Sequence, residues 1–554
     1  MKKNIIDNVE NELIEAIQEG LVETLEQEGI QLEKIPAIKV EVPREKEHGD
    51  YATNIAMVMA KHFKRAPRQI ADLLKENIES DLIEDISVAG PGFINFDLKD
   101  KWLYETIDLI DQLQEDYGKV EFGQQKKVLI EFVSANPTGP LHVGHSRGAV
   151  VGDMTANIME AAGYNVDREY YFNDAGNQID ILAKSTLIRY KQLFDIDVDL
   201  PQNAYHGKYL IDIARQLKEK YGEELLAKDE DKQLNICKEF AFESLKTKIE
   251  EDLEYFGIKF DNWFYESTLH DGDIEEAINI LKEKGYTYEK EGALWLKSTE
   301  FSDDKDRVII KSDGSLTYLA ADIAYHLDKI ERGYDKLINV WGADHHGYIN
   351  RVKASIQALG YPKDILEIII VQLVNLMRDG EKIPMSKRAG EFVTMTDVID
   401  EVGKDAARYF YIMRSSDSHF DFDLELAKEQ SSNNPVYYIQ YAHARIHSIL
   451  ENAEDIDLEN VDYELLDSEE EIDLIKLMAR YPEVIKDSAE SRQPHILANY
   501  AYDLANAFHI FYNKRQVITS DKKLSKARLK LVVSLQRVLK NLFNVLGIEA
   551  PDQM

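Results

Sequence analysis

Two histidines stand three residues apart in a glycine-rich loop, within NPTGPLHVGHSRGA (136–149). The loop follows an apolar run predicted as a strand and precedes a predicted helix, whose N-terminus offers N–H groups to phosphate. If a helical turn begins at Leu141, His142 and His145 point to one side and can donate ring N–H groups to phosphate oxygens. Such a pair can instead pack in the core or bind a metal, although no carboxylate or cysteine lies nearby at ligand spacing.

A carboxylate interrupts the apolar run itself. Glu131 lies within VLIEFV (128–133), and a charge in a strand buried on both faces is costly unless it is paired. We therefore expect Glu131 to meet a cation, which a substrate with a guanidinium or ammonium group would supply. The alternative is an edge position that faces water. Asn136, five residues later, is suited to the α-amino or carboxylate end of such a substrate.

A tyrosine and an aspartate form a second candidate pair. In TYLAADIAYHLDKI (317–330), Tyr318 and Asp322 stand four residues apart on one face of a predicted helix, with Tyr325 one turn further along. A planar guanidinium fits both a carboxylate and a flat aromatic surface. A packed tyrosine beside a solvated aspartate is the alternative.

The composition limits the kinds of protein that carry these residues. A chain of 554 residues, 44% of them hydrophobic and 30% charged, predicts about two to four globular units. The first residues lack the apolar core of a secretory signal and no apolar run is long enough to span a bilayer, so we expect a cytoplasmic protein. One cysteine, Cys237, excludes a disulfide framework and a multi-thiolate zinc site.

The charge distribution bears on nucleic-acid binding. A net charge of −36 opposes contact with phosphates. Basic residues nevertheless gather in KHFKRAPR (61–68) and in the final helical region after Asn513. Either stretch alone is typical of a solvated face, but two patches at opposite ends of a long chain fit an extended polyanion.

The predicted elements divide the chain into three parts. Residues 1–115 form a small α+β module that includes a strand–turn–strand in ISVAGPGFINFDL (86–98). Residues 120–404 alternate strands and helices, as in a doubly wound parallel sheet, with a polar, helix-rich insert at about 180–300. Residues 405–554 are almost purely helical, with breaks at Pro435, Pro482 and Pro494.

The histidine loop resembles a known signature. His142-Val143-Gly144-His145 is similar to the HIGH sequence of class I aminoacyl-tRNA synthetases, and SANPTGPLHVGHSRGA (134–149) resembles its arginine-specific form. PMSK (384–387) resembles the second signature, KMSK, with proline in place of the first lysine. That departure puts one phosphate contact in doubt, for which Lys382 or Arg388 can substitute.

Both flanking parts share the resemblance. Asp405-Ala406-Ala407-Arg408 and the helix after it resemble the opening of the anticodon-binding domain of arginyl-tRNA synthetases. Residues 1–115 resemble the N-terminal module of that family, which contacts the elbow loops of tRNA.

The resemblance implies a multidomain α/β protein with a Rossmann-like catalytic core, an N-terminal α+β module and a C-terminal helical bundle. It implies ATP-dependent ligation of L-arginine to tRNA(Arg) through an arginyl-adenylate, with release of AMP and pyrophosphate. ATP enters as its Mg²⁺ complex, and we expect a monomer without a tightly bound cofactor, a protein metal site or a membrane partner. A catalytically silent tRNA-binding paralogue is the alternative.

The resemblance also assigns residues. Catalysis is expected from His142, His145 and Lys387. The expected ATP contacts lie in the two signature loops: Pro137, Thr138, Gly139, Pro140, Leu141, His142, Val143, Gly144, His145, Met385, Ser386 and Lys387. The expected arginine contacts include two residues of WGADHHG (341–347), and are Glu131, Ser134, Asn136, His145, Tyr318, Asp322, Asp344 and His345. The expected tRNA contacts, some of which can instead pack in the bundle, are Tyr437, Tyr441, Arg445, Lys514, Arg515 and Met554.

Overall fold

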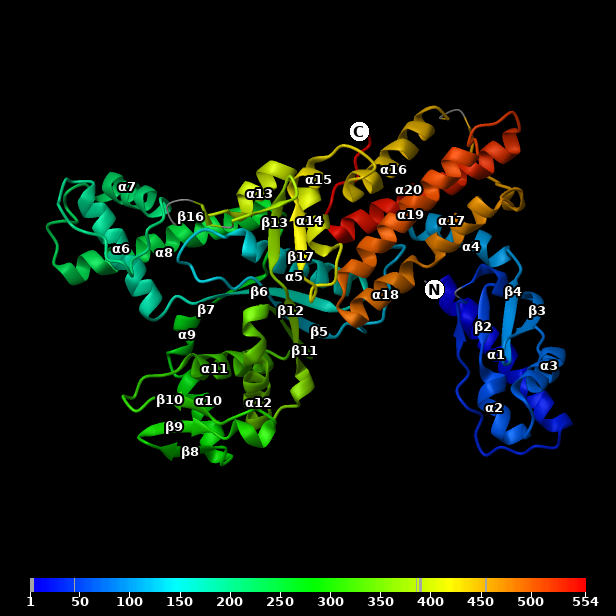
Figure 1. The fold of residues 1–554 in the computed structure, drawn as a ribbon, viewed down its shortest axis with the longest axis horizontal. Coiled ribbons are helices and arrows are strands. Elements are labelled where there is room, and N and C mark those ends of the chain that lie inside the picture. Colours follow the sequence, from blue (N-terminus) through cyan, green and yellow to red (C-terminus); the bar gives the residue numbers. More distant parts are fainter. Residues whose placement is uncertain (1–3, 44, 385, 388–390, 454–455) are drawn as a thin grey trace.

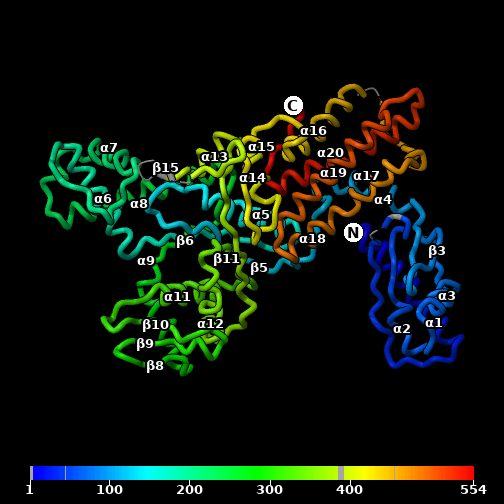
Figure 2. The backbone as a smooth tube through the Cα atoms, in the orientation of Figure 1, coloured from blue at the N-terminus to red at the C-terminus, as the bar shows by residue number. Residues whose placement is uncertain are grey.

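The computed structural model describes residues 4–43, 45–384, 386–387, 391–453 and 456–554. A central sheet carries lobes on several sides, and the N-terminal unit lies at one end, next to the helical C-terminal part (Figures 1 and 2). None of the helices in the described ranges is long and apolar enough to cross a membrane.

The N-terminal unit is built on an antiparallel sheet. Its strand order is β1-β2-β4-β3, and the predicted strand–turn–strand is confirmed as the pair β3 and β4. Gly90 and Gly92 in the turn have positive φ, which side chains other than glycine rarely adopt. The elements are α1 (Ile5–Gln27), β1 (Val40–Glu41), β2 (Tyr51–Thr53), α2 (Ile55–Phe63), α3 (Pro67–Asn77), β3 (Ile83–Ala89), β4 (Phe93–Leu98) and α4 (Lys101–Leu113).

The central unit is built on a five-stranded parallel sheet of order β12-β11-β5-β6-β7. The chain starts at β5, adds β6 and β7 on one side, and returns to add β11 and β12 on the other. The predicted doubly wound sheet is confirmed, and its topological switch point lies between β5 and β11, where ligands bind in such folds. The strands are β5 (Lys127–Glu131), β6 (Asn165–Phe172), β7 (Asn262–Tyr265), β11 (Lys336–Gly342) and β12 (Leu366–Val371), with α5 (Val143–Ala161) after β5 and α12 (Ile349–Leu359) after β11.

Two lobes are inserted between strands of the sheet, one before β7 in the sequence and one after it. The segment expected as one insert, about 180–300, therefore contains β7, a strand of the central sheet. Because β7 has only four residues, it was hard to recognise in the sequence. The first lobe is helical, with α6 (Asn177–Gln192), α7 (Tyr209–Tyr221) and α8 (Glu230–Tyr255), and Cys237 is buried in it. The second contains α9 (Glu266–Leu269), α10 (Asp273–Glu283), the antiparallel strands β8 (Thr287–Lys290), β9 (Ala293–Leu296) and β10 (Arg307–Ile310), and α11 (Tyr318–Glu331).

A helical bundle forms the C-terminal part. Pro435, Pro482 and Pro494, predicted as breaks, occupy the first or second position of α16, α18 and α19, where a missing N–H costs nothing. The bundle helices are α13 (Met395–Val402), α14 (Lys404–Ile412), α15 (Leu424–Lys428), α16 (Pro435–Glu451), α17 (Glu469–Ala479), α18 (Tyr481–Ser491), α19 (Pro494–Lys514) and α20 (Lys522–Leu546). Short strands connect it to the core: β13 (Val374–Arg378), β14 (Glu381–Ile383), β15 (Ser386–Lys387), β16 (Glu391–Phe392) and β17 (Phe420–Asp423).

A buried arginine joins these parts. Arg408 of α14 is 1% exposed, and its guanidinium donates to the Asp153 carboxylate of α5 at 2.5 Å. It also donates to the Phe256 carbonyl after the helical insert at 3.2 Å and to the Leu546 carbonyl of α20 at 3.4 Å. One side chain thus fixes α5, the insert and the last helix of the bundle to one another.

Candidate active site

The loop after β5 begins with a strained turn. Val133 and Ser134 have φ of 66° and 41°, and the Ser134 N–H donates to the Phe132 carbonyl at 2.9 Å. This is a γ-turn with a left-handed central residue, which is unfavourable for a β-branched side chain. The turn directs the Ser134 hydroxyl back to Glu131, to which it donates at 2.9 Å. Strain of this kind is concentrated at functional sites.

The two histidines lie side by side at the start of α5. Their ring centres are 3.8 Å apart, so the expectation that both rings point to one side is confirmed. The Gly144 N–H donates to His142 Nδ1 at 3.1 Å, and the His142 N–H donates to His145 Nδ1 at 3.3 Å. Because both Nδ1 atoms accept, a neutral ring carries its proton on Nε2.

Burial keeps both rings neutral. It lowers the pKa of His142, and it lowers the pKa of His145 to about 3, with the neighbouring His142 adding to the effect. The pair therefore offers Nε2–H donors rather than positive charge. Together with the N–H groups at the start of α5, these donors suit phosphate oxygens.

The rest of the first signature loop contributes mainly backbone. Pro137, Leu141 and Val143 are buried, whereas Thr138, Gly139 and Pro140 are half-buried and Gly144 is exposed. The Tyr209 hydroxyl of the helical insert donates to the Thr138 carbonyl, which ties the insert to this loop.

The second signature loop approaches the first through its backbone. Val143 N–H donates to the Val393 carbonyl at 3.0 Å, and Met395 N–H donates to the Leu141 carbonyl at 2.9 Å. Ser386 and Lys387 form β15, which pairs with β16. Met385 and the side chains of Ser386 and Lys387 lie outside what the structure describes.

Glu131 meets its cation inside the chain. It is 7% exposed, and its Oε2 lies 2.6 Å from Nζ of Lys329, which has no exposure. The expectation of a paired Glu131 is confirmed, but the partner belongs to α11 rather than to a substrate. Spacing along the chain gave no sign of this contact, because 198 residues separate the two.

Two further carboxylates share this region with hydroxyl partners. Tyr348 donates to Asp322 at 2.5 Å, and Tyr171 donates to Glu266 at 2.7 Å. Burial raises the pKa of Asp322 to about 7, and the negative charges of Glu131 and Glu266 add to the rise. The hydrogen bond from Tyr348 acts in the opposite direction and lowers this pKa. A buried group of carboxylates with too few cations attracts a cationic ligand. Sequence reasoning missed Glu266, which has no distinctive spacing.

The other expected arginine contacts lie at different depths. Tyr318 is 71% exposed at the start of α11, one turn before Asp322, whereas Tyr325 is buried and donates to Glu169 at 2.7 Å. Asn136 is exposed and donates to Gln178 at 2.7 Å. Asp344 and His345 are exposed in a 3-10 helix after β11, where His345 Nε2 lies 3.6 Å from Asp344 Oδ2. The structure gives neither residue a contact with Asp322.

The expected tRNA contacts lie on the bundle. Tyr437 and Tyr441 stack with ring centres 6.1 Å apart, and the Arg445 guanidinium lies 4.8 Å from the ring of Tyr512. Lys514 and Arg515 both pair with Glu470, at 2.9 Å. A cavity of about 470 Å³ reaches from Tyr437 to Met554, which is 50% exposed.

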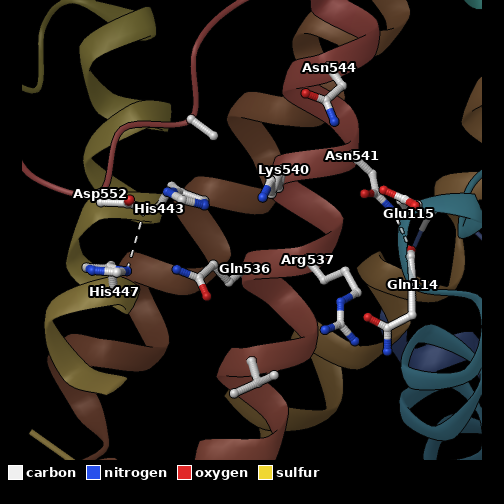
Figure 3. A pocket seen from close by; sticks show the side chains of 12 residues that line it. Gln114, Glu115, His443, His447, Gln536, Arg537, Lys540, Asn541, Asn544 and Asp552 are labelled. Atoms are coloured by element: carbon white, nitrogen blue, oxygen red, sulfur yellow. Dashed lines mark hydrogen bonds and ion pairs between the residues drawn. The ribbon is translucent and has the colours of Figure 1, made fainter. Parts of the chain in front are cut away.

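A polar cavity of about 600 Å³ lies where the bundle meets the end of the N-terminal unit (Figure 3). His443 and His447 of α16 line one side, Gln114 and Glu115 line the other, and Arg537 and Lys540 of α20 lie between them. Beside the cavity the two units are joined directly, because Asn541 donates to the Gln114 carbonyl at 2.8 Å and Arg537 pairs with Asp111 at 3.2 Å.

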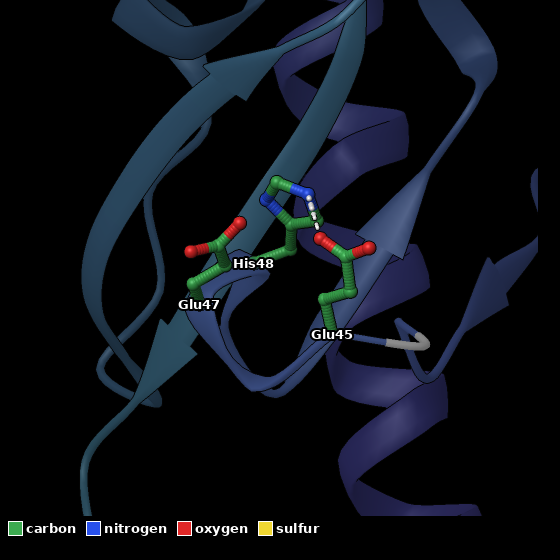
Figure 4. Close-up of side chains that lie close together, drawn as sticks. All are labelled: Glu45, Glu47 and His48. Carbon is green, nitrogen blue, oxygen red and sulfur yellow. Dashed lines mark ion pairs between the residues drawn. The ribbon is translucent and has the colours of Figure 1, made fainter.

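One cluster among the described residues has metal-ligand spacing. Glu45, Glu47 and His48 lie together in the N-terminal unit, and His48 Nε2 is 3.6 Å from Glu45 Oε2 (Figure 4). The three side chains are exposed or half-buried and belong to a different unit from the catalytic sheet. Clusters of exposed acidic groups are common, and this one has no link to the reaction site.

Family models match all three parts of the chain. "Arginyl tRNA synthetase N terminal domain" matches residues 6–98, "tRNA synthetases class I (R), catalytic domain" matches 108–419, and "DALR anticodon binding domain" matches 439–554.

Curated relatives and a solved structure that resemble this chain belong to the same family as the matching models. Arginine--tRNA ligase 1 of Halalkalibacterium halodurans is 50% identical over 94% of this chain and 95% of its own length. The arginine--tRNA ligase of Anoxybacillus flavithermus is 48% identical over the whole of both chains. The arginyl-tRNA synthetase of Thermus thermophilus has the same fold, with a TM-score of 0.72 at 23% identity over 98% of this chain and 100% of that one. Motifs, strand order and relatives thus lead to one conclusion: this chain belongs to the arginyl-tRNA synthetase family of class I synthetases.

Proposed function

We propose that this chain ligates L-arginine to tRNA(Arg) in two steps, through an arginyl-adenylate, with release of AMP and pyrophosphate. The observation that carries the proposal is that β5 ends at the switch point of the sheet in Glu131, which belongs to a group of carboxylates with Asp322 and Glu266, and leads to two neutral histidines side by side at the N-terminus of α5. The histidines suit a triphosphate and the carboxylates a guanidinium.

In the first step the carboxylate of arginine attacks the α-phosphate of ATP, so the protein does not have to generate a nucleophile. Its task is to hold the reactants in line and to stabilise negative charge on the phosphates. The Nε2–H groups of His142 and His145, the N-terminus of α5 and the ammonium of Lys387 take this role. Mg²⁺ arrives with ATP and neutralises its phosphates.

Arginine is recognised at both ends. Asp322, Glu266 and Glu131 surround the guanidinium, and Tyr318 supplies a flat surface at the mouth of the pocket. Asn136 faces the α-amino and carboxylate groups, Ser134 contributes by holding Glu131 in place, and Asp344 and His345 lie at the edge of the site beside adenosine.

The RNA is bound by the parts that flank the sheet. Tyr437, Tyr441, Arg445 and Met554 contact the anticodon loop, with Lys514 and Arg515 beside them, and the N-terminal unit contacts the elbow. Stacking on exposed aromatic rings is a common way to hold unpaired bases. We further propose that the enzyme acts as a monomer in the cytoplasm.

Arginine-dependent exchange of pyrophosphate into ATP tests this function. We expect exchange with arginine and not with other amino acids, measured with and without tRNA(Arg), followed by transfer of arginine to the RNA. A silent tRNA-binding paralogue would bind the RNA and show no exchange under either condition. That outcome refutes the proposal.

A further inference from the structure

The ammonium group of Lys329 is completely occupied by its neighbours. Its Nζ lies 2.6 Å from Glu131 Oε2 and donates to Asn339 Oδ1 at 3.2 Å. It also lies 4.0 Å from the ring centre of Tyr325. These three neighbours match the three N–H donors of an ammonium group. Lys329 is therefore a fixed, fully buried neighbour of Glu131.

The other oxygen of Glu131 is also held. Glu131 Oε1 accepts the Ser134 hydroxyl at 2.9 Å, and that hydroxyl accepts the Tyr171 N–H at 3.2 Å. The strained turn at Val133 is what brings Ser134 into this position. Glu131 is thus oriented from both sides, with one oxygen neutralised by Lys329.

Among the described residues, the buried charges of this region divide into matched and unmatched groups. Glu131 forms an ion pair with Lys329. Glu169 forms an ion pair with Arg332, and the two terminal guanidinium nitrogens of Arg332 lie 2.6 and 3.0 Å from the carboxylate oxygens of Glu169. Asp322 and Glu266 receive tyrosine hydroxyls instead, and His270 lies 3.7 Å from Glu266 but is charged only when protonated. Of these described carboxylates, the ones for which the structure gives no lysine or arginine partner at ion-pair distance are therefore Asp322 and Glu266, and not Glu131.

We propose that Lys329 determines the side-chain specificity of the pocket by occupying the position on Glu131 that the ammonium of a lysine substrate would take. The inference rests on the proposed function, in which these carboxylates bind arginine. An ammonium is a compact point charge that a single carboxylate satisfies, whereas a guanidinium is a planar group with five donors that several acceptors can share. Lysine would meet a carboxylate already neutralised and a like charge beside it, which disfavours the wrong substrate.

The test is the substrate preference of Lys329→Met. We would measure kcat/KM for pyrophosphate exchange with arginine, lysine and ornithine, with tRNA(Arg) present. The arginine-to-lysine ratio should fall by about tenfold or more, because an unpaired Glu131 then accepts a substrate ammonium. Arg332→Met is the matched control: it removes the cation that follows α11 and pairs with Glu169. Arg332→Met should lower the free energy of unfolding and leave the arginine-to-lysine ratio of kcat/KM unchanged.

Two more variants separate specificity from folding. In Lys329→Ala, added ethylammonium should restore the arginine-to-lysine ratio by occupying the vacated space. In the double variant Glu131→Gln/Lys329→Met, which leaves no unpaired charge, KM for arginine should rise while the preference over lysine stays within about threefold of the parent enzyme. This double variant decides the matter if Lys329→Met does not fold.

The outcomes that overturn the inference differ from those that overturn the function. A parent enzyme without arginine-dependent exchange refutes the proposed function. A parent enzyme that exchanges, with a folded Lys329→Met whose activity falls equally for arginine and lysine, refutes the role of Lys329 alone. Loss of the arginine preference in the double variant also refutes it, because Lys329 would then not act through Glu131.

Discussion

The proposed contact between Asp322 and arginine makes the arginine affinity of this enzyme depend on pH. Its pKa is raised to about 7 by burial, and the nearby Glu131 and Glu266 add to the rise. Arginine stays charged throughout the usual pH range, and its guanidinium binds the ionised carboxylate. With a pKa of about 7, roughly nine-tenths of the molecules carry an ionised Asp322 at pH 8 and roughly one-tenth at pH 6. KM for arginine should therefore rise about tenfold as the pH falls from 8 to 6.

The direction of the effect follows from linkage. The folded protein without substrate holds a proton on Asp322 more tightly than the unfolded chain, whose aspartates titrate near 3.8. This contribution to the free energy of unfolding is complete below pH 3.8 and is lost as the pH rises through 7. In the proposed complex, arginine replaces the proton as the partner of Asp322. The stabilisation of the protein by arginine should accordingly increase between pH 6 and pH 8.

Two assays measure this directly. KM for arginine is obtained from pyrophosphate exchange at saturating ATP and RNA, at pH values from 6 to 8. Calorimetry at pH 7 in two buffers of different ionisation enthalpy should detect about half a proton released for each arginine bound. Asp322→Asn keeps the size of the side chain and should raise KM while removing its pH dependence. A KM that is constant from pH 8 to pH 6, or normal in Asp322→Asn, refutes the role of this carboxylate.

Three other expectations follow from the site and its supports. His145→Ala should lower kcat by about 10²-fold, the scale of a lost preorganised donor, with little change in KM for arginine; normal turnover would exclude the histidine from the reaction. Tyr348→Phe should raise KM for arginine about tenfold, because the ionised Asp322 loses a hydroxyl donor, and it should shift the pH profile of KM to higher pH. Arg408→Met should lower the free energy of unfolding, measured in urea, by about 3 kcal/mol, because the buried Asp153 then keeps only Arg168, at 3.7 Å, as a cationic partner. The double variant Arg408→Met/Asp153→Asn should recover part of that loss.

Local patterns made much of the fold predictable. The alternation of apolar strands and helices predicted the parallel sheet, and the Gly-Pro-Gly turn predicted the β3–β4 pair. Four residues of β7 among polar helices carry too little periodicity to be recognised as a core strand. The second lobe was hidden for the same reason, because its strands are four residues each.

The site was predictable where its residues are neighbours in sequence. The rings of His142 and His145 lie as their spacing indicates, since one helical turn controls both. The pairing of Glu131 with Lys329 and the position of Glu266 depend on which strands become neighbours in the sheet, a property of tertiary structure. The energetic cost of a buried charge predicted that a partner exists, and only the structure identifies it.

The contacts of Arg408 have a consequence for synthesis on the ribosome. Its partner Asp153 is made almost four hundred residues before its partner Leu546. The helix α5, which begins at the two histidines, therefore receives this attachment only after α20 has been made. Premature termination before α20 yields a chain in which the sheet is present but that helix is not anchored to the bundle, so unfinished products should be poor ligases.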